Sequence, residues 1–118
     1  METFQTLLIL TNLPDEASAQ TLAATLVTER LAACVNILAP CRSVYRWQGE
    51  VESAQEVPLL IKTTTARYAA LETAIRARHP YELPEIIAVP IAHGLPEYLS
   101  WVAAETLVEH PDGNPATC

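Results

Sequence analysis

The side chains capable of nucleophilic or metal chemistry are few and scattered along the sequence. The three cysteines and three histidines are Cys34, Cys41, Cys118, His79, His93 and His110. No two cysteines form a CxxC pair, and the chain has no GxSxG, HExxH, GxGxxG or P-loop sequence. Cys–His catalysis would require Cys34 or Cys41 to approach His79 across the fold, and nothing in the sequence demands that approach. The sequence therefore predicts a protein that is not an enzyme.

One segment, HPYELPEIIAVP at residues 79–90, concentrates rigid and polar residues. Pro80 cannot continue a helix, and Pro84 restricts the residue before it to extended conformations. Tyr81 and Glu82 are therefore held between two fixed points. This connector could line a site with its tyrosine, two carboxylates and histidine, or it could be a packed corner without a ligand.

Apolar runs predict the strands that must position these residues. The runs lie at residues 4–10, 33–38, 59–63 and 85–89. Val44, Tyr45 and Trp47 favour a further strand, and Gln48-Gly49 after them is a plausible tight turn. Cys34 and Cys41, seven residues apart, would lie on opposite faces of a straight strand, although Pro40 between them could bend it.

Helical spacing of apolar residues predicts two helices between these strands, and a third follows them. The two inner stripes are Ala19, Leu22, Ala23, Leu26, Val27 and Leu31, then Tyr68, Leu71, Ala74, Ile75 and Arg78. Asp15 is a plausible N-cap of the first helix, and Thr64 or Thr65 of the second. Pro96 suits the first turn of the last helix.

The order β-α-β-β-α-β plus a C-terminal helix predicts an α+β, ferredoxin-like fold: a four-stranded antiparallel sheet with two helices on one face. The two arms around Gly49 are each about ten residues or more, longer than the typical 5–6 residues of a strand. An isolated two-stranded ribbon is only marginally stable in water. We therefore expect each extended hairpin to pair with strands of a second copy, in a homo-oligomer.

The composition limits the number of domains, the binding partners and the cellular compartment that can be expected. The 118 residues suit one domain, expected over residues 1–108, with a flexible tail at 109–118. The net charge of −7 argues against binding to nucleic acid or to an anionic membrane surface. An odd number of cysteines without a disulfide framework fits a reducing compartment, so we expect the protein in the cytoplasm.

The chain resembles the CutA divalent-cation tolerance family over roughly residues 4–105. The matching segments are PDEASAQTLAATLV, ERLAACVNI, SVYRWQGEVE, LLIKT, HPYELPEIIAVP and the YLSW sequence after Gly94. The resemblance implies a tight homotrimer of ferredoxin-like subunits, similar in architecture to the PII signalling proteins. It also implies a role in tolerance of copper or other divalent metals, with weak copper binding.

The resemblance places the metal ligands of some relatives at Thr11, Arg78 and His79. A hydroxyl and an arginine do not replace the thiolate and imidazole ligands that copper favours, so only His79 matches. Cys34 could compensate as a second ligand, or it could be a small buried thiol. His93 and His110 are expected to face solvent.

In the resembling fold, six residues could gather near a cleft between subunits: Tyr45, Trp47, Glu56, Lys62, Tyr81 and Trp101. This cleft could bind a small polar or anionic molecule, with Lys62 supplying charge and the aromatic rings its walls. The two tryptophans could instead pack the contact between subunits. Lys62 itself could reach solvent or pair with Glu56. The functions that remain are a metal-responsive trimer, a PII-like regulatory module and a scaffold without a ligand.

Overall fold

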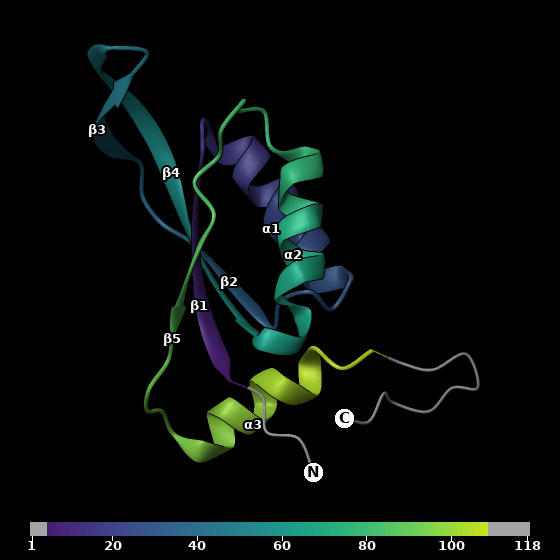
Figure 1. Ribbon diagram of the computed structural model, residues 1–118. Coiled ribbons are helices and arrows are strands. Elements are labelled where there is room, and N and C mark those ends of the chain that lie inside the picture. Colours follow the sequence, from purple (N-terminus) through teal and green to yellow (C-terminus); the bar gives the residue numbers. More distant parts are fainter. Residues whose placement is uncertain (1–4, 109–118) are drawn as a thin grey trace.

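The computed structural model describes residues 5–108 of the chain. Within this range the elements are β1 Thr6–Leu13, α1 Glu16–Thr28, β2 Cys34–Ile37, β3 Cys41–Trp47, β4 Glu50–Thr64, α2 Thr65–Arg78, β5 Ile87–Pro90 and α3 Pro96–Glu105 (Figure 1). The order confirms the predicted α+β, ferredoxin-like arrangement with an added C-terminal helix. The expected tail at 109–118, which includes Cys118 and His110, lies outside the described residues.

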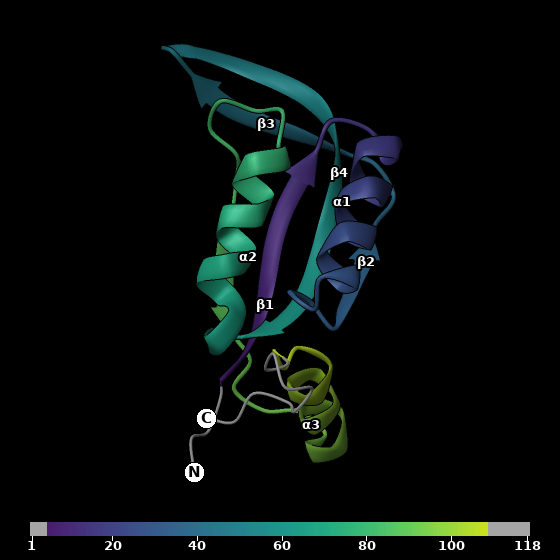
Figure 2. The same cartoon turned by 90° about the vertical axis from the view of Figure 1, so that its right-hand side faces the viewer.

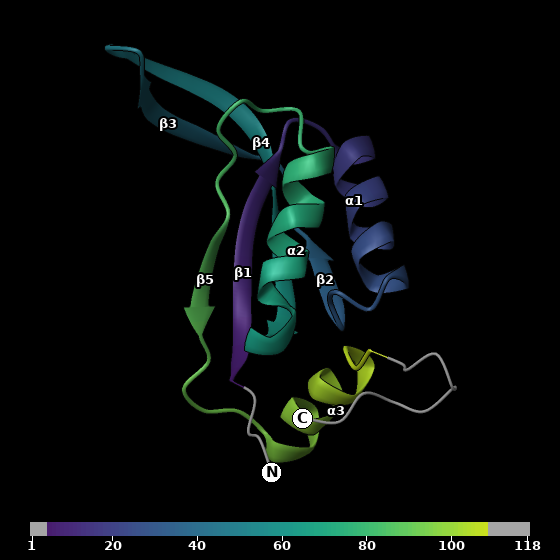
Figure 3. The same cartoon turned by 45° about the vertical axis from the view of Figure 1, so that its right-hand side comes forward.

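The sheet has the order β2-β4-β1-β5, and all of its paired strands run antiparallel. β3 pairs with the other half of β4. The helices α1 and α2 lie side by side over one face of the sheet, and α3 lies across the end where β1 begins (Figure 3). The central strand β4 therefore joins two structures, the helix-covered sheet and the β3–β4 ribbon that projects beyond it (Figure 2).

Buried and partly exposed side chains alternate along β1 and the second half of β4, and the buried ones face the helices. Ile9 and Leu13 on β1 are almost fully buried, as are Leu59 and Ile61 on β4. The helices contribute most of the predicted stripes: Ala19, Leu22 and Leu26 from α1, then Leu71, Ala74 and Ile75 from α2. Val27 and Arg78, which the spacing also placed there, are exposed instead. Each large apolar side chain contributes about 1.5–3 kcal/mol when fully buried, so this layer stabilises the subunit.

The ends of α1 have identifiable caps. The Asp15 carboxylate accepts a hydrogen bond from the Ser18 N–H at 2.8 Å, which confirms the predicted N-cap. At the other end Arg30 has φ +58°, and the Leu31 N–H donates to the Leu26 carbonyl oxygen at 2.9 Å. This left-handed residue turns the chain back toward β2. Thr64 occupies the N-cap position of α2 but forms no side-chain capping bond.

The ribbon turns at Gln48-Gly49, as the sequence predicts. Both residues have positive φ, +51° and +84°, and Trp47 pairs with Glu50 across a two-residue loop. Two consecutive positive φ values are typical of a type I′ turn, whose twist suits a hairpin. β4 extends over 15 residues, so its first half has no neighbour other than β3 among the described residues.

The predicted second strand is interrupted at Ala39-Pro40, which separates β2 from β3. Ile37 pairs with Leu59 and Cys41 pairs with Glu56, so four steps on one side match three on β4. One extra residue reverses the alternation of side chains. Cys34 and Cys41, which pair with Lys62 and Glu56, therefore lie on the same face of the sheet. The strand does not run straight, and the interruption at Pro40 is the alternative that the sequence left open.

The last strand and helix differ slightly from expectation. β5 begins at Ile87 rather than at Glu85, because Glu85 belongs to the connector. There its carboxylate accepts a hydrogen bond from the Asn12 side-chain amide at 3.1 Å. α3 starts with Pro96 in its first turn, as predicted. In the described part of the chain, each helix is too short or too polar to cross a membrane.

Candidate functional site

The face of the sheet away from α1 and α2 carries apolar side chains that remain partly exposed. Ile87 and Val89 on β5 are 49% and 46% exposed, and they lie opposite Leu10 and Leu8 of β1. Leu60 of β4 lies across from Leu10 on the other side. Below we call this surface, Leu8, Leu10, Leu60, Ile87 and Val89, the open face.

A cluster of polar side chains lies at the end of the open face where β1 begins. The Lys62 ammonium group donates a hydrogen bond to the Asn36 side-chain oxygen and lies 4.0 Å from the Cys34 sulfur. Burial, followed by the neighbouring Cys34, raises the pKa of Tyr98. The ring of Tyr98 in turn lies 5.5 Å from that of Trp101. Lys62 is thus bound to Asn36, and the expectation that it pairs with Glu56 is wrong.

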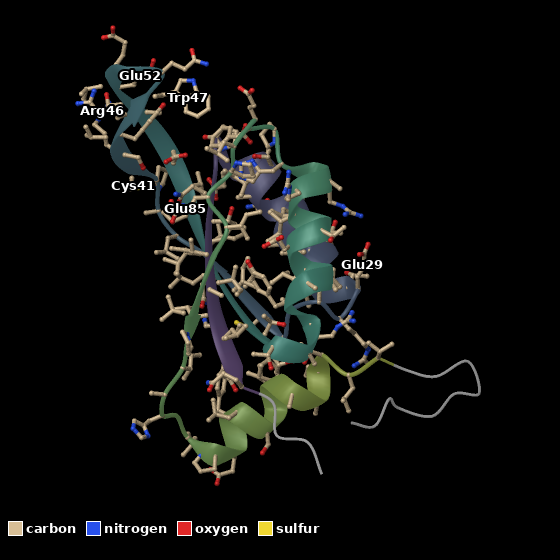
Figure 4. All side chains as sticks on the ribbon, in the orientation of Figure 1. Glu29, Cys41, Arg46, Trp47, Glu52 and Glu85 are labelled. Atoms are coloured by element: carbon tan, nitrogen blue, oxygen red, sulfur yellow. The ribbon has the colours of Figure 1, made fainter. Side chains whose placement is uncertain are left out.

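A cleft of about 890 Å³ lies at the other end of the sheet, between the ribbon and the Pro-rich connector. Its walls are Asn12, Ser43, Val44, Tyr45, Trp47, Glu52, Ala54, Glu56, Pro80, Tyr81, Glu82, Leu83 and Glu85. Among these residues are four carboxylates and three aromatic rings, and there is no lysine, arginine or histidine. In Figure 4 Trp47 projects from the ribbon toward the helices, whereas Arg46 projects from the other side.

His79 fixes the connector against the sheet beneath this cleft. Its Nδ1 accepts a hydrogen bond from the Tyr81 backbone N–H at 3.2 Å, so this nitrogen carries no proton. Its Nε2 therefore bears the proton and donates to the Asn12 carbonyl oxygen at 2.7 Å. Burial, the largest effect, lowers the pKa of His79, although the Asn12 carbonyl and the Glu56 charge act in the opposite direction. The ring is thus a neutral structural link.

Tyr81 and Glu56 form the polar floor of the cleft. Burial, then the hydrogen bond to Glu56 and its negative charge, raises the pKa of Tyr81 to about 12. The phenol therefore remains protonated at neutral pH and can donate to the carboxylate. The rings of Tyr81 and His79 lie 4.8 Å apart, so the packing of His79 also orients Tyr81.

The structure brings together four of the six residues predicted for a ligand cleft. Tyr45, Trp47, Glu56 and Tyr81 line it within one chain. Lys62 is six residues from Glu56 along β4, about 20 Å at the rise of a strand. Trp101 lies on α3, at the same end as Lys62. A cleft that unites all six residues remains a prediction about an assembly of several chains.

The two residues predicted as metal ligands lie in different places. His79 binds Asn12, which pairs with Pro58, whereas Cys34 pairs with Lys62. Four residues of β4 separate these positions, about 13 Å, so the side chains share no site within one chain. Between residues 5 and 108, no three or more His, Cys, Asp or Glu side chains are close enough together to hold a metal ion.

Thr11 and Cys41 complete the positions singled out by the sequence. Thr11 is buried on the helix-covered face, and its hydroxyl has no hydrogen-bond partner in the described part of the chain. Cys41 is an exposed free thiol at the base of the ribbon. Neither residue lines the cleft.

Sequence reasoning missed Glu52 and Asn12 in the cleft. Glu52 enters because it pairs with Tyr45 across the ribbon, and partners in an antiparallel ladder share one face. A two-residue turn at Gln48-Gly49 fixes that register, so counting outward from the turn would have found Glu52. Asn12 gave no such signal, because its position depends on where the connector crosses β1.

Comparisons with known proteins agree with this architecture. The family model described as CutA1 divalent ion tolerance protein matches residues 7–105. The divalent-cation tolerance protein CutA of Thermus thermophilus is 52% identical over 98 residues, which cover 83% of this chain and 95% of the relative. The crystal structure of CutA from Xylella fastidiosa has a TM-score of 0.84 at 49% identity, covering 86% and 98% of the two chains.

A more distant structure preserves the same fold. The periplasmic divalent cation tolerance protein CutA from Archaeoglobus fulgidus has a TM-score of 0.83 at 35% identity, covering 86% of this chain and 98% of that one. The family match spans β1 through α3, including both walls of the cleft. The chain therefore belongs to the CutA1 divalent ion tolerance family.

Proposed function

We propose that this protein acts without catalysis in divalent-cation tolerance, as a homotrimer that binds cations weakly. The observation that carries the cation-binding part is the lining of the cleft, with Glu52, Glu56, Glu82 and Glu85 and no basic side chain. Four carboxylates in one concave surface concentrate cations from solution. Because they do not converge as a coordination shell, we expect hydrated ions held by charge rather than by direct ligation.

Copper needs more specific ligands than a hydrated divalent cation does, because it favours nitrogen and sulfur ligands. Both ring nitrogens of His79 are engaged in hydrogen bonds, and Cys34 lies beside the Lys62 ammonium group. Copper binding through either residue would have to displace these contacts. We therefore propose that copper binds weakly, as other divalent cations do in the cleft.

Calorimetric titration of the full chain with Cu²⁺ and Mg²⁺ tests this proposal. Glu52→Gln/Glu82→Gln should weaken the binding of both ions, whereas His79→Ala should affect copper little. A high-affinity copper isotherm that disappears in the His79→Ala or the Cys34→Ser variant would instead place copper at those residues.

The homotrimer is supported by two unpartnered surfaces. The ribbon leaves the outer edges of β3 and half of β4 free in the described chain, and Val44 and Val51 on it are 70% and 67% exposed. The open face adds further exposed apolar area. Exposed strand edges and apolar surfaces of this kind are normally covered in stable proteins, and pairing between copies would cover both.

The alternative is a PII-like regulatory trimer that binds a small anionic molecule between subunits. It requires the Lys62 of a neighbouring chain to approach the carboxylate-lined cleft, because Lys62 lies about 20 Å from Glu56 within its own chain. A thermal-shift screen separates the two: stabilisation by nucleotides or organic acids that is lost in Lys62→Gln would favour the regulatory trimer.

We place the protein in the cytoplasm. Cys34 and Cys41 are both free, and Cys41 is exposed, which is compatible with a reducing compartment. The Archaeoglobus relative is described as periplasmic, so cell fractionation with antibody detection is the direct test.

A further inference from the structure

We propose that the tail, residues 109–118, docks on the outer face of the helix layer, in a groove between α2 and the turn that ends α1. The groove, which we call the helix groove, is lined by Glu29, Leu31, Ala69, Ala70, Thr73, Ala74, Ala77 and Arg78. It lies across the sheet from the open face, and none of its lining residues belongs to the ribbon. The inference goes beyond the proposed function, because it concerns a surface that neither the cation cleft nor the subunit contacts use.

Short side chains on α2 form the floor of the helix groove. Ala69, Thr73 and Ala77 recur every four residues, so they lie along one face of the helix, and all three are exposed. Leu31 forms an apolar wall from the turn after α1. The groove has a volume of about 510 Å³, and its small side chains allow a second backbone to approach α2 closely.

The path of the chain brings the tail to the helix groove. α3 ends beneath the turn that follows α1 (Figure 3), where the Arg30 guanidinium donates to the Glu105 carbonyl oxygen at 3.4 Å. Arg30 lies between Glu29 and Leu31, which both line the groove. The tail begins four residues after Glu105. Its ten residues span up to about 33–36 Å when extended, whereas α2 is about 21 Å long, so the tail reaches the whole groove.

The charge around the helix groove is opposite to the charge of the tail. Four of the seven basic residues of the chain belong to α2 or to the turn at residues 29–31: Arg30, Arg67, Arg76 and Arg78. Against them stand two carboxylates, Glu29 and Glu72, which leaves a net charge of +2 on these two segments. The tail contributes Glu109 and Asp112. In a chain with a net charge of −7, this face therefore attracts an acidic segment, and the carboxylate-lined cleft repels it.

Attachment to the same chain makes weak contacts sufficient. Exposed ion pairs contribute little individually, so a separate peptide of this sequence would bind poorly. A tethered segment, however, experiences an effective concentration in the millimolar range. Pro111 and Pro115 restrict the residue before each of them to extended backbone, which reduces the conformational entropy that docking in a groove would cost.

Cys118 is a natural probe of the position of the tail. In the full chain with Cys34→Ser and Cys41→Ser, Thr73→Cys places a single thiol in the helix groove. Formation of its disulfide with Cys118 is followed in a buffer of reduced and oxidised glutathione. Non-reducing denaturing electrophoresis separates a disulfide within one chain from one that joins two chains.

Ala24→Cys on α1 is the matched control, because Ala24 is exposed but does not line the groove. Ala24 is six residues from Arg30, and Thr73 is six residues from Arg67, whose guanidinium donates to the Arg30 carbonyl oxygen at 3.2 Å. The two thiols are thus similarly placed relative to the start of the tail. Ala77→Cys provides a second groove variant, which unlike Thr73→Cys removes no side-chain hydrogen bond.

We expect the disulfide within one chain to form about tenfold faster or more in Thr73→Cys and Ala77→Cys than in Ala24→Cys. High salt should reduce this difference, because it screens the charges that attract the tail. Glu109→Gln/Asp112→Asn should slow the reaction of the groove variants about threefold or more and leave Ala24→Cys unchanged. Circular dichroism establishes that each variant is folded as the parent is.

Equal rates in the groove variants and in Ala24→Cys would overturn the proposal. Groove variants that form only a disulfide between two chains would also overturn it, because the groove would then receive the tail of a neighbouring copy. Rates that Glu109→Gln/Asp112→Asn leaves unchanged would refute the charge complementarity on which docking depends. Failure of the proposed function is separate, since it appears as absent binding of divalent cations or as a monomer.

Discussion

The His79 side chain donates from Nε2 to the Asn12 carbonyl oxygen at 2.7 Å, and this bond ties the Pro-rich connector to the end of β1. The same ring accepts the Tyr81 N–H. One buried imidazole thus positions the connector wall of the cleft. The family resemblance draws attention to His79 as a metal ligand, but its contacts within the subunit are structural.

Replacing His79 should therefore reduce stability. His79→Ala leaves the Asn12 carbonyl and the Tyr81 N–H without their partner, and we expect a loss of about 1–3 kcal/mol in the free energy of unfolding. Chemical denaturation at neutral pH measures it. An unfolding free energy equal to that of the parent protein would show that the link contributes nothing.

The neutral state of His79 also predicts a pH dependence. Burial lowers the pKa of His79 in the folded chain below its ordinary value of about 6.5. The unfolded chain then binds more protons between these two values, so stability is complete above pH 6.5 and falls as the pH drops toward the folded-state pKa. His79→Gln should flatten this part of the curve, whereas Thr11→Val, which removes no titratable group, should retain it.

Two buried threonines on the helix-covered face should respond oppositely to valine. The Thr11 hydroxyl has no partner in the described chain, whereas the Thr63 hydroxyl donates to the Leu31 carbonyl oxygen at 2.7 Å. Thr11→Val should raise the free energy of unfolding by about 1 kcal/mol, and Thr63→Val should lower it by about 1–2 kcal/mol. Denaturant titration measures the free energy of unfolding of both variants, and each variant is the control for the other. A change of the same sign in both would contradict the hydrogen-bond assignment.

Arg30 occupies a left-handed position that glycine adopts without steric cost. Arg30→Gly and Arg30→Ala remove the same side-chain contact with Glu105, so their difference isolates the backbone. We expect the glycine variant to be about 1 kcal/mol more stable than the alanine variant. Thermal unfolding of the pair measures this difference, and a more stable alanine variant would refute the left-handed turn.

Much of the fold follows from patterns that act over short distances. The apolar run at residues 4–10 predicts a strand, and Gln48-Gly49 predicts the hairpin turn. Both features depend on neighbouring residues alone, and the structure confirms them.

Other features depend on register, which the sequence does not reveal so directly. The extra residue at Ala39-Pro40 reverses the alternation and moves Cys41 to the same side of β4 as Cys34. The sequence allowed an ion pair between Glu56 and Lys62. In the structure the two residues lie six positions apart on one extended strand, too far from each other to pair. The cleft depends on where the connector lies relative to the ribbon, a tertiary relationship that Tyr45 and Tyr81 could not indicate separately.

The turn at Gly49 should matter more for assembly than for the subunit. A Cβ at Gly49 meets no atom within 4 Å, so the cost of Gly49→Val arises from its φ of +84°. The ribbon lies outside the core, and its distortion should lower the affinity between subunits more than the unfolding free energy of one subunit. Light scattering over a dilution series would contradict this if Gly49→Val dissociated no earlier than the parent protein.

Self-association through the ribbon and the open face is the central claim, and the mass of the particle in dilute solution tests it most directly. Sedimentation equilibrium at low micromolar concentration should give about three times the 12.9 kDa of one chain. A folded particle with the mass of a single chain, verified by circular dichroism in the same sample, would contradict the account.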